Sequence, residues 1–162
     1  MAFEIQDDDV KVIVRLVDRL GIRTVLEFGP GHSTSVFLAL GCEVDSVESD
    51  NDRLMKMIHG FHGKKANIHP CSDGYPVKSP AFSVSKRWDL AFVDGPWGEE
   101  PGKFMPRLNS CLACFRRAPL ILLHDTKRQN EGRIIAVMLD IGCTIIDTFN
   151  TEKGMVLLKT LL

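Results

Sequence analysis

Apolar side chains follow two different spacings along this chain, one typical of helices and one typical of strands. Between residues 7 and 20 they recur every three or four positions, which predicts an amphipathic helix that ends at Gly21. The same helical spacing recurs in four later segments. The apolar positions that define the five predicted helices are Val10, Ile13, Leu16, Val17 and Leu20; Val36, Phe37 and Leu40; Leu54, Met55 and Ile58; Phe104, Leu108, Cys111, Leu112 and Phe115; and Ile134, Ile135, Met138 and Ile141.

The segments between these predicted helices contain short apolar runs of the length that strands have. Residues 119–123 are almost wholly apolar, as expected for a strand that is buried on both faces of a sheet. Residues 152–154 predict a hairpin turn between the last two strands. The predicted strands cover residues 23–28, 43–48, 66–69, 88–93, 119–123, 144–149 and 155–160.

Helices and strands therefore alternate until the chain closes with a hairpin. This order predicts an α/β fold with a doubly wound, mostly parallel sheet and helices on both faces, in which the hairpin makes one strand antiparallel. The length of 162 residues predicts a single domain over residues 1–162. Residues 70–86 hold three prolines and four serines, so we expect a loop there that contributes to a binding site.

Composition narrows the classes of function. The formal net charge of −1 gives no electrostatic case for nucleic acid or an anionic membrane as the main partner. No apolar run approaches the roughly 20 residues that span a bilayer, and the acidic residues 1–10 contain no signal-peptide core, so we expect a cytoplasmic protein. The five cysteines are too irregularly spaced for a disulfide framework. We expect the CxxC pair Cys111 and Cys114 to pack in the core rather than to bind a metal.

Polar residues that suit ligand binding follow five of the predicted strands. In an open α/β sheet, ligands bind beyond the carboxyl ends of the strands, near the point where the strand order reverses. We therefore expect a ligand site at this edge of the sheet. The residues that mark it are Glu27 and the glycine turn after the first strand, Glu48 after the second, Ser72 and Asp73 after the third, Asp94 after the fourth, and His124 and Asp125 after the fifth.

Residues 25–34 predict a strand, a tight turn and the start of a helix. Gly29 and Gly31 allow a ligand to approach the backbone closely, and the free N–H groups of a helix N-terminus favour an anionic or polar ligand. Glu48 lies 21 residues after Glu27, and an acid about 20 residues beyond such a turn is the expected partner of ribose hydroxyls. A dinucleotide fingerprint would place a third glycine at position 34, where this chain has Thr34.

The segment Glu27-Phe28-Gly29-Pro30-Gly31 resembles the E/DxGxG first motif of class I S-adenosylmethionine (SAM)-dependent methyltransferases. The resemblance extends to Glu48, Asp94 and the closing hairpin, and it implies a Rossmann-like seven-stranded sheet in the order 3-2-1-4-5-7-6. Ser33 departs from the pattern, since many members have a third glycine there. The cofactor-binding residues that the resemblance implies are Glu27, Gly29, Pro30, Gly31, Ser33, Glu48, Ser49, Ser72, Asp73 and Asp94, with Ser72 and Asp73 in the adenine-contacting position.

Residues 92–98 and 122–126 look like segments of small bacterial methyltransferases near the catechol-O-methyltransferase-like group. In the metal-dependent members, carboxylates after strands four and five hold a divalent cation. Asp94 and Asp125 match two of these ligand positions, which implies Mg²⁺ or a similar ion, but Thr126 replaces the usual third ligand and leaves the set incomplete.

Three residues are candidates for catalysis, namely Asp94, His124 and Asp125. Asp94 is expected near the methionine part of the cofactor, and His124 is either a general base or a packing residue at the strand end. The leading hypothesis is SAM-dependent methylation of a small molecule, with oxygen as one candidate atom. The alternatives are a SAM-binding protein without catalytic activity or dependent on a partner, and a nicotinamide-dependent oxidoreductase. A homodimer is compatible with the sequence.

Overall fold

The computed structural model describes residues 5–71, 86–96 and 105–161. These residues form a seven-stranded sheet in the order β3-β2-β1-β4-β5-β7-β6, which confirms the predicted topology. The first five strands in this order are parallel, and β7 pairs antiparallel with both of its neighbours. The strands are β1 (Thr24–Phe28), β2 (Glu43–Glu48), β3 (Ala66–Pro70), β4 (Leu90–Val93), β5 (Leu120–His124), β6 (Thr144–Phe149) and β7 (Met155–Lys159).

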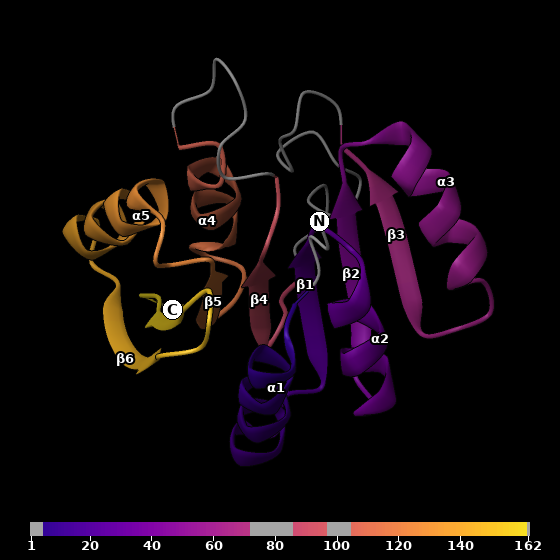
Figure 1. Ribbon diagram of the computed structural model, residues 1–162, viewed down its shortest axis with the longest axis horizontal. Coiled ribbons are helices and arrows are strands. Elements are labelled where there is room, and N and C mark those ends of the chain that lie inside the picture. The colour runs from indigo at the N-terminus through magenta and orange to yellow at the C-terminus, as the bar shows by residue number, and fades with distance from the viewer. Residues whose placement is uncertain (1–4, 72–85, 97–104, 162) are drawn as a thin grey trace.

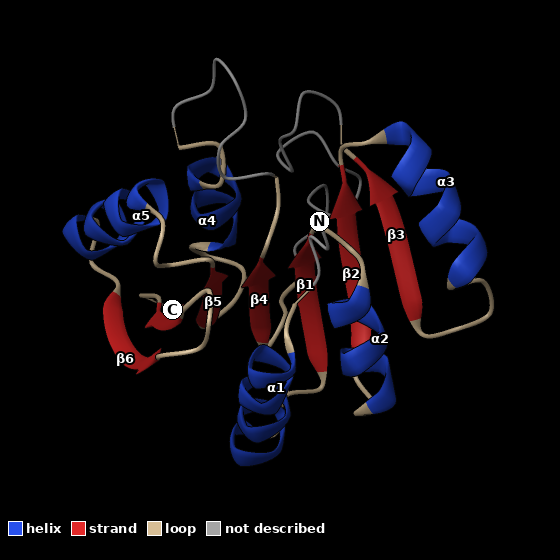
Figure 2. Ribbon diagram, in the orientation of Figure 1, coloured by secondary structure: helices blue, strands red, loops and turns tan. Residues whose placement is uncertain are grey.

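Helices cover both faces of the sheet (Figures 1 and 2). On one face, apolar residues of two helices pack with residues of β1, β4 and β5 such as Val25, Phe92 and Leu122. On the other face, two later helices pack against neighbouring strand residues such as Leu26 and Ile121. The helices of the first face are α1 (Asp7–Leu20) and α2 (His32–Ala39), those of the second are α4 (Leu108–Cys114) and α5 (Gln129–Asp140), and α3 (Asn51–Gly60) packs beside β2 and β3.

Local signals explain where two of the helices begin and end. The side chains of Gln6 and Asp9 form a capping box at the start of α1, and Gly21 ends this helix with a φ of 64° in the left-handed region. Asp50 caps α3 by accepting hydrogen bonds from the N–H groups of Asp52 and Arg53. Both helices therefore occupy the segments that their sequence pattern predicted.

The strand register brings the predicted site residues into one row. Phe28 at the end of β1 pairs with Val47 of β2 on one side and with Val93 of β4 on the other. Val93 in turn pairs with Leu123 of β5. The residues that follow these positions must therefore lie along one edge of the sheet. They are Gly29, Glu48, Asp94 and His124.

Some apolar residues that defined the predicted helices are not buried. Leu20, Met55, Ile58, Leu112 and Ile141 are exposed. Leu20 and Ile141 lie at the ends of α1 and α5, and α3 buries Leu54 alone, so the buried face of these helices is narrower than their apolar stripe. β4 begins at Leu90 rather than at residue 88, although Trp88 is itself buried. Phe104 lies outside the described residues.

The CxxC pair is part of the core. Cys111 and Cys114 are fully buried beside Ile134 and Met138 of α5, which confirms the packing interpretation. Among the described helices, none combines the length and the apolar character that a membrane crossing requires.

Candidate cofactor and acceptor site

The turn after β1 is held tightly against the neighbouring strand ends. The N–H of Gly29 donates to the Val47 carbonyl at 3.1 Å, and Gly29 has a φ of 89°. A Cβ at Gly95, in the turn after β4, would lie 3.0 Å from the Cα of Gly29. The two turns therefore pack backbone to backbone, and both positions require glycine. This contact fixes the floor of the site at the point where the strand order reverses.

Glu27 lies beneath this turn and is fully buried. Its carboxylate accepts hydrogen bonds from the hydroxyls of Ser33 at 2.5 Å, Thr34 at 2.6 Å and Ser46 at 2.5 Å. Burial raises the pKa of Glu27 to about 7, although the three hydroxyl bonds act in the opposite direction. Glu27 thus joins β1, the start of α2 and β2, and it shapes the turn from below. Ser33 is part of the same bonded group.

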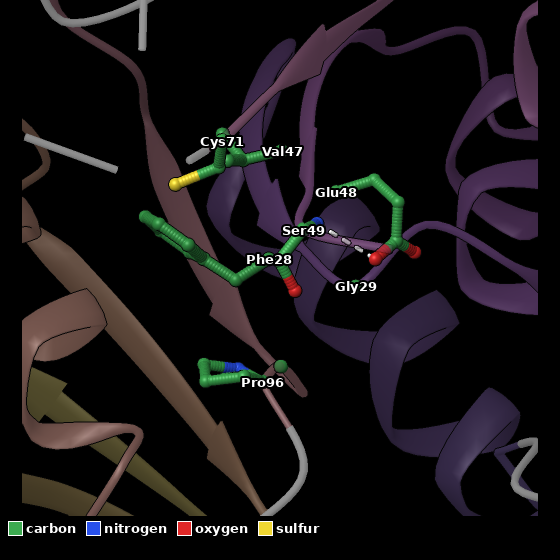
Figure 3. Close-up of a pocket in the computed structure, with 8 residues that line it drawn as sticks. Phe28, Gly29, Val47, Glu48, Ser49, Cys71 and Pro96 are labelled. Carbon is green, nitrogen blue, oxygen red and sulfur yellow. Dashed lines mark hydrogen bonds between the residues drawn. The ribbon is translucent and has the colours of Figure 1, made fainter. Parts of the chain in front are cut away.

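Glu48 ends β2 and is nearly buried. Its Oε1 accepts hydrogen bonds from the N–H groups of Ser49 at 2.8 Å and Asp50 at 2.9 Å. Figure 3 shows the side chain turned back toward Ser49, with this bond drawn as a dashed line. The second oxygen, Oε2, is buried and makes no hydrogen bond within the part of the chain that the structure describes, although the Arg53 guanidinium lies near it. A buried acceptor of this kind is costly unless a ligand or water satisfies it.

Arg53 connects the two sides of the site. Its Nη2 donates to the Pro30 carbonyl at 2.8 Å, and its Nε lies 3.3 Å from Glu48 Oε2. Arg53 comes from the first turn of α3, so it joins this helix both to the glycine turn and to the end of β2. The Arg53 side chain is about half exposed.

A small pocket opens between the glycine turn and the ends of β2 and β4 (Figure 3). Ser72 and Asp73, which were predicted to contact adenine, lie outside the described residues, as does Trp97. Of the cofactor-binding residues predicted at the first two strand ends, Gly29, Glu48 and Ser49 line the pocket, and the others do not. The lining residues are Phe28, Gly29, Val47, Glu48, Ser49, Cys71, Gly95 and Pro96.

His124 lies between two carboxylates. Its Nδ1 is 2.8 Å from Asp94 Oδ1, and its Nε2 is 3.0 Å from Asp9 Oδ2. Alternation along β5 places His124 on the same face as Leu122, where α1 supplies Asp9. Burial alone would lower the pKa of His124, but the hydrogen bonds to Asp9 and Asp94, with their charges and that of Asp125, raise it to about 9. The side chain is fully buried.

Asp125 follows His124 with a φ of 60°, an unusual value for a residue other than glycine. Its Oδ2 lies 3.0 Å from Arg107 Nη1 and 2.8 Å from Arg128 Nη1. The next residue, Thr126, donates its N–H to the Gly154 carbonyl at 3.1 Å. The segment after β5 is thereby fixed both to two arginines and to the closing hairpin.

Arg107 is the centre of the polar contacts beside Asp94. Its Nη2 donates to the Asp94 carbonyl at 2.8 Å and lies 3.3 Å from the Asp94 carboxylate. Its Nε donates to the Pro96 carbonyl at 2.8 Å, and its Nη1 lies 3.6 Å from Glu131 Oε1. Burial raises the pKa of Glu131 despite the nearby Arg107 charge. The guanidinium thus joins the turn after β4 to α5.

Asp9, Arg53 and Arg107 were not predicted as site residues, although the sequence carries a signal for two of them. Asp9 lies four residues before Ile13, and Arg107 lies four residues before Cys111. Residues four apart share one face of a helix, so each charge continues a buried apolar face. A charged residue at such a position needs a buried partner. Arg53 carries no comparable signal.

Comparisons with known proteins identify the fold. No protein-family model matches the chain, and no curated protein matches it in sequence. An O-methyltransferase from Bacillus cereus, solved in complex with S-adenosylhomocysteine (SAH), superposes with a TM-score of 0.78 at 13% identity, over 99% of this chain and 84% of that protein. An SAH-bound methyltransferase from Podospora anserina gives a TM-score of 0.70 at 10% identity, over 98% of this chain and 80% of that protein.

A third similar structure is the 1,6-didemethyltoxoflavin-N1-methyltransferase from Burkholderia thailandensis, solved with its substrate and SAH. It gives a TM-score of 0.62 at 15% identity, over 95% of this chain and 79% of that protein. These similarities, together with the strand order, define the fold as the Rossmann-like methyltransferase fold. These similarities cover 95–99% of this chain.

Proposed function

We propose that this protein transfers a methyl group from SAM to a small-molecule acceptor. The observation that carries the proposal is the pocket at the reversal of strand order, where the glycine turn lies beside Glu48, whose buried Oε2 makes no hydrogen bond within the described residues and has only the ion pair with Arg53. A ribose hydroxyl is a donor that suits this oxygen. The fold supports the same conclusion, because methyltransferases with bound SAH share it.

In this proposal, different residues of the site bind different parts of the cofactor. The backbone of Gly29, Pro30 and Gly31 would face the methionine part, while Glu48 and Ser49 would bind the ribose. Ser72 and Asp73 remain the expected adenine contacts. Asp94 follows β4 directly beside the glycine turn and has a side chain about 15% exposed. In the proposal, Asp94 faces the methionine end of the cofactor.

SAM supplies an electrophilic methyl group on a sulfonium, so this chain has to align the acceptor and remove its proton where the acceptor carries one. His124 is poorly placed to act as a base, because both of its ring nitrogens face carboxylates and its raised pKa of about 9 favours the protonated form. We propose that His124 is a positioning residue that holds Asp94. Asp94 then remains the candidate for contact with the cofactor or the acceptor.

A SAM-binding protein without catalytic activity is the second candidate. One observation favours it, namely that His124, Asp125 and Arg107 are buried and bonded to one another rather than turned toward an acceptor. The two candidates share the cofactor pocket and differ on the acceptor side. Turnover with an acceptor would separate them.

Isothermal titration calorimetry with SAM and SAH tests the proposal, with NADH as the comparison ligand. We expect one site per chain with a dissociation constant in the micromolar range for SAM and SAH. NADH should neither bind nor displace SAH. Absence of SAM and SAH binding at millimolar concentration would overturn the proposal, and saturable NADH binding would support the nicotinamide-dependent alternative instead.

A further inference from the structure

The guanidinium of Arg107 lies between the two carboxylates that were predicted to hold a divalent cation. Its Nη2 is 3.3 Å from Asp94 Oδ1, and its Nη1 is 3.0 Å from Asp125 Oδ2. Arg107 has 2% of its surface exposed. An arginine side chain stays charged at every pH at which proteins fold, so this position holds a permanent positive charge.

The guanidinium is fixed in place by main-chain acceptors as well as by the carboxylates. Its Nε donates to the Pro96 carbonyl at 2.8 Å, its Nη2 to the Asp94 carbonyl at 2.8 Å, and its Nη1 to the His124 carbonyl at 3.3 Å. These three carbonyls belong to the turns after β4 and β5. Moving Arg107 aside would leave them without this donor in a buried site, which is costly.

The remaining candidate ligands are also engaged. Asp94, His124 and Asp125 each offer one atom within 4.8 Å of the others, which is the geometry that suggests a metal site. However, both His124 nitrogens face carboxylate oxygens, and Asp125 Oδ2 also faces Arg128 at 2.8 Å. Thr126, at the usual third ligand position, lies against Gly154 of the closing hairpin. The donor set therefore does not fit a divalent cation.

We infer that Arg107 takes the place of a divalent cation in this site, so that Asp94 and Asp125 are held by a fixed guanidinium and the protein needs no metal. The arrangement of charges does not depend on the proposed function. Only the role of Arg107 in catalysis rests on the proposed methyl transfer. Arg107 acts through Asp94 and is a positioning residue. The reaction would then use the arginine charge where metal-dependent relatives of the proposed kind use an ion.

The arrangement makes a sharp prediction about metal binding. In the intact protein, an added cation would be repelled by Arg107 and would have to displace it from buried partners. Removing the guanidinium would leave the carboxylates of Asp94, Asp125 and Glu131, each of which contacts Arg107, around the space that it fills. Carboxylate oxygens suit a cation such as Mn²⁺ or Mg²⁺. Loss of Arg107 should therefore create a metal site that the intact protein does not have.

Titration with Mn²⁺ alone tests this inference, with the free ion measured by electron paramagnetic resonance. The wild type should show no saturable binding at millimolar Mn²⁺, and the thermal midpoint of unfolding should be the same with Mg²⁺ and with EDTA. Arg107→Ala should bind one Mn²⁺ at least about tenfold more tightly than wild type, and this gain should disappear in Arg107→Ala combined with Asp125→Asn. Arg107→Lys keeps the charge and should not gain the site.

One saturable Mn²⁺ site in the wild type that Asp125→Asn abolishes would overturn the inference, as would a folded Arg107→Ala variant without any gain in metal affinity. If Arg107→Ala does not fold, the wild-type titration and Arg107→Lys decide the question. None of these measurements uses SAM. Failure of SAM binding and failure of the arginine inference would therefore be recorded separately.

Discussion

His124 Nε2 lies 3.0 Å from Asp9 Oδ2, although the two residues are 115 positions apart in the chain. Both side chains are fully buried. The contact joins the first turn of α1 to the end of β5, directly beside Asp94. The N-terminal helix is thus fastened to the candidate site by a charge pair as well as by its apolar face.

Removing Asp9 should destabilise the protein strongly. Asp9→Ala removes the carboxylate that faces His124 Nε2, while Asp94 remains at Nδ1, and breaking a buried ion pair costs about 3–5 kcal/mol. Asp9→Asn retains an acceptor and should cost less. Asp7→Asn in the same helical turn is the control, because Asp7 is exposed. Urea unfolding measures the free energies, and equal midpoints for Asp9→Ala and Asp7→Asn would contradict the structural role of the pair.

Stability should fall as the pH rises from neutral to alkaline. The pKa of His124 is raised from 6.5 to about 9, so its contribution is fully present below pH 6.5 and is lost as the pH rises through 9. A shift of this size corresponds to roughly 3 to 3.5 kcal/mol of unfolding free energy. Unfolding in urea at several pH values between 6.5 and 10 measures the slope.

The fall in unfolding free energy between pH 6.5 and 10 should be caused by His124. His124→Asn should flatten the dependence, whereas His62→Asn, at an exposed position, should leave it unchanged. A slope of the same size in both variants would show that another group is responsible. Glu27, whose pKa is raised to about 7, also loses stabilisation with rising pH, but it does so between about 4.5 and 7, below most of the His124 window.

The contact between the turns after β1 and β4 predicts that a side chain at Gly95 destabilises the protein. In Gly95→Ala the new Cβ would lie 3.0 Å from the backbone N and Cα of Gly29, and such overpacking costs about 1–3 kcal/mol. Because the strain falls on the glycine turn, SAH affinity should decrease as well. Calorimetry and thermal unfolding measure the two effects.

Gly132 provides the matched control for Gly95. A Cβ at this exposed helical position would meet no atom within 4 Å, so Gly132→Ala should leave SAH binding unchanged and stabilise α5 by about 0.5–1 kcal/mol. Full SAH affinity in Gly95→Ala would mean that the turn contact does not shape the pocket.

Glu48 should contribute to cofactor affinity more than any other charged residue of β2. Glu48→Ala removes the acceptor proposed for the ribose hydroxyls, and the loss of hydrogen bonds to a carboxylate should weaken SAH binding about 10- to 100-fold. Glu43→Ala is the control, because Glu43 is exposed at the opposite end of the same strand. An unchanged dissociation constant for Glu48→Ala would remove the ribose contact from the proposal.

The sequence predicted the topology and the row of strand-end residues because alternating apolar periods and glycine turns are local signals. It did not predict how the charges would pair. Asp9 is an acid in the first turn of α1, where it caps the helix, but its partner His124 lies on a distant strand. The partners of Arg107 were not predicted either, since its carboxylates come from two different strand ends. Such pairings depend on packing between elements and leave only the weak signal of a charge on an apolar face.

The roles of the predicted residues divided in the same way. Gly29 and Glu48 line the pocket, and their contact with the cofactor stays a prediction. Glu27 begins the glycine motif, and its carboxylate accepts hydrogen bonds from Ser33, Thr34 and Ser46 beneath the turn. The motif therefore located the turn correctly, while the direction of each side chain depended on neighbours that a spacing pattern does not encode.

A crystal structure of the protein with SAH is the most direct test of the central claim that the pocket between the glycine turn and Glu48 binds SAM. We predict SAH with its ribose hydroxyls on the Glu48 carboxylate and its amino acid part over Gly29, toward Asp94. SAH bound elsewhere on the molecule, or crystals that remain free of it at millimolar concentration, would contradict the claim.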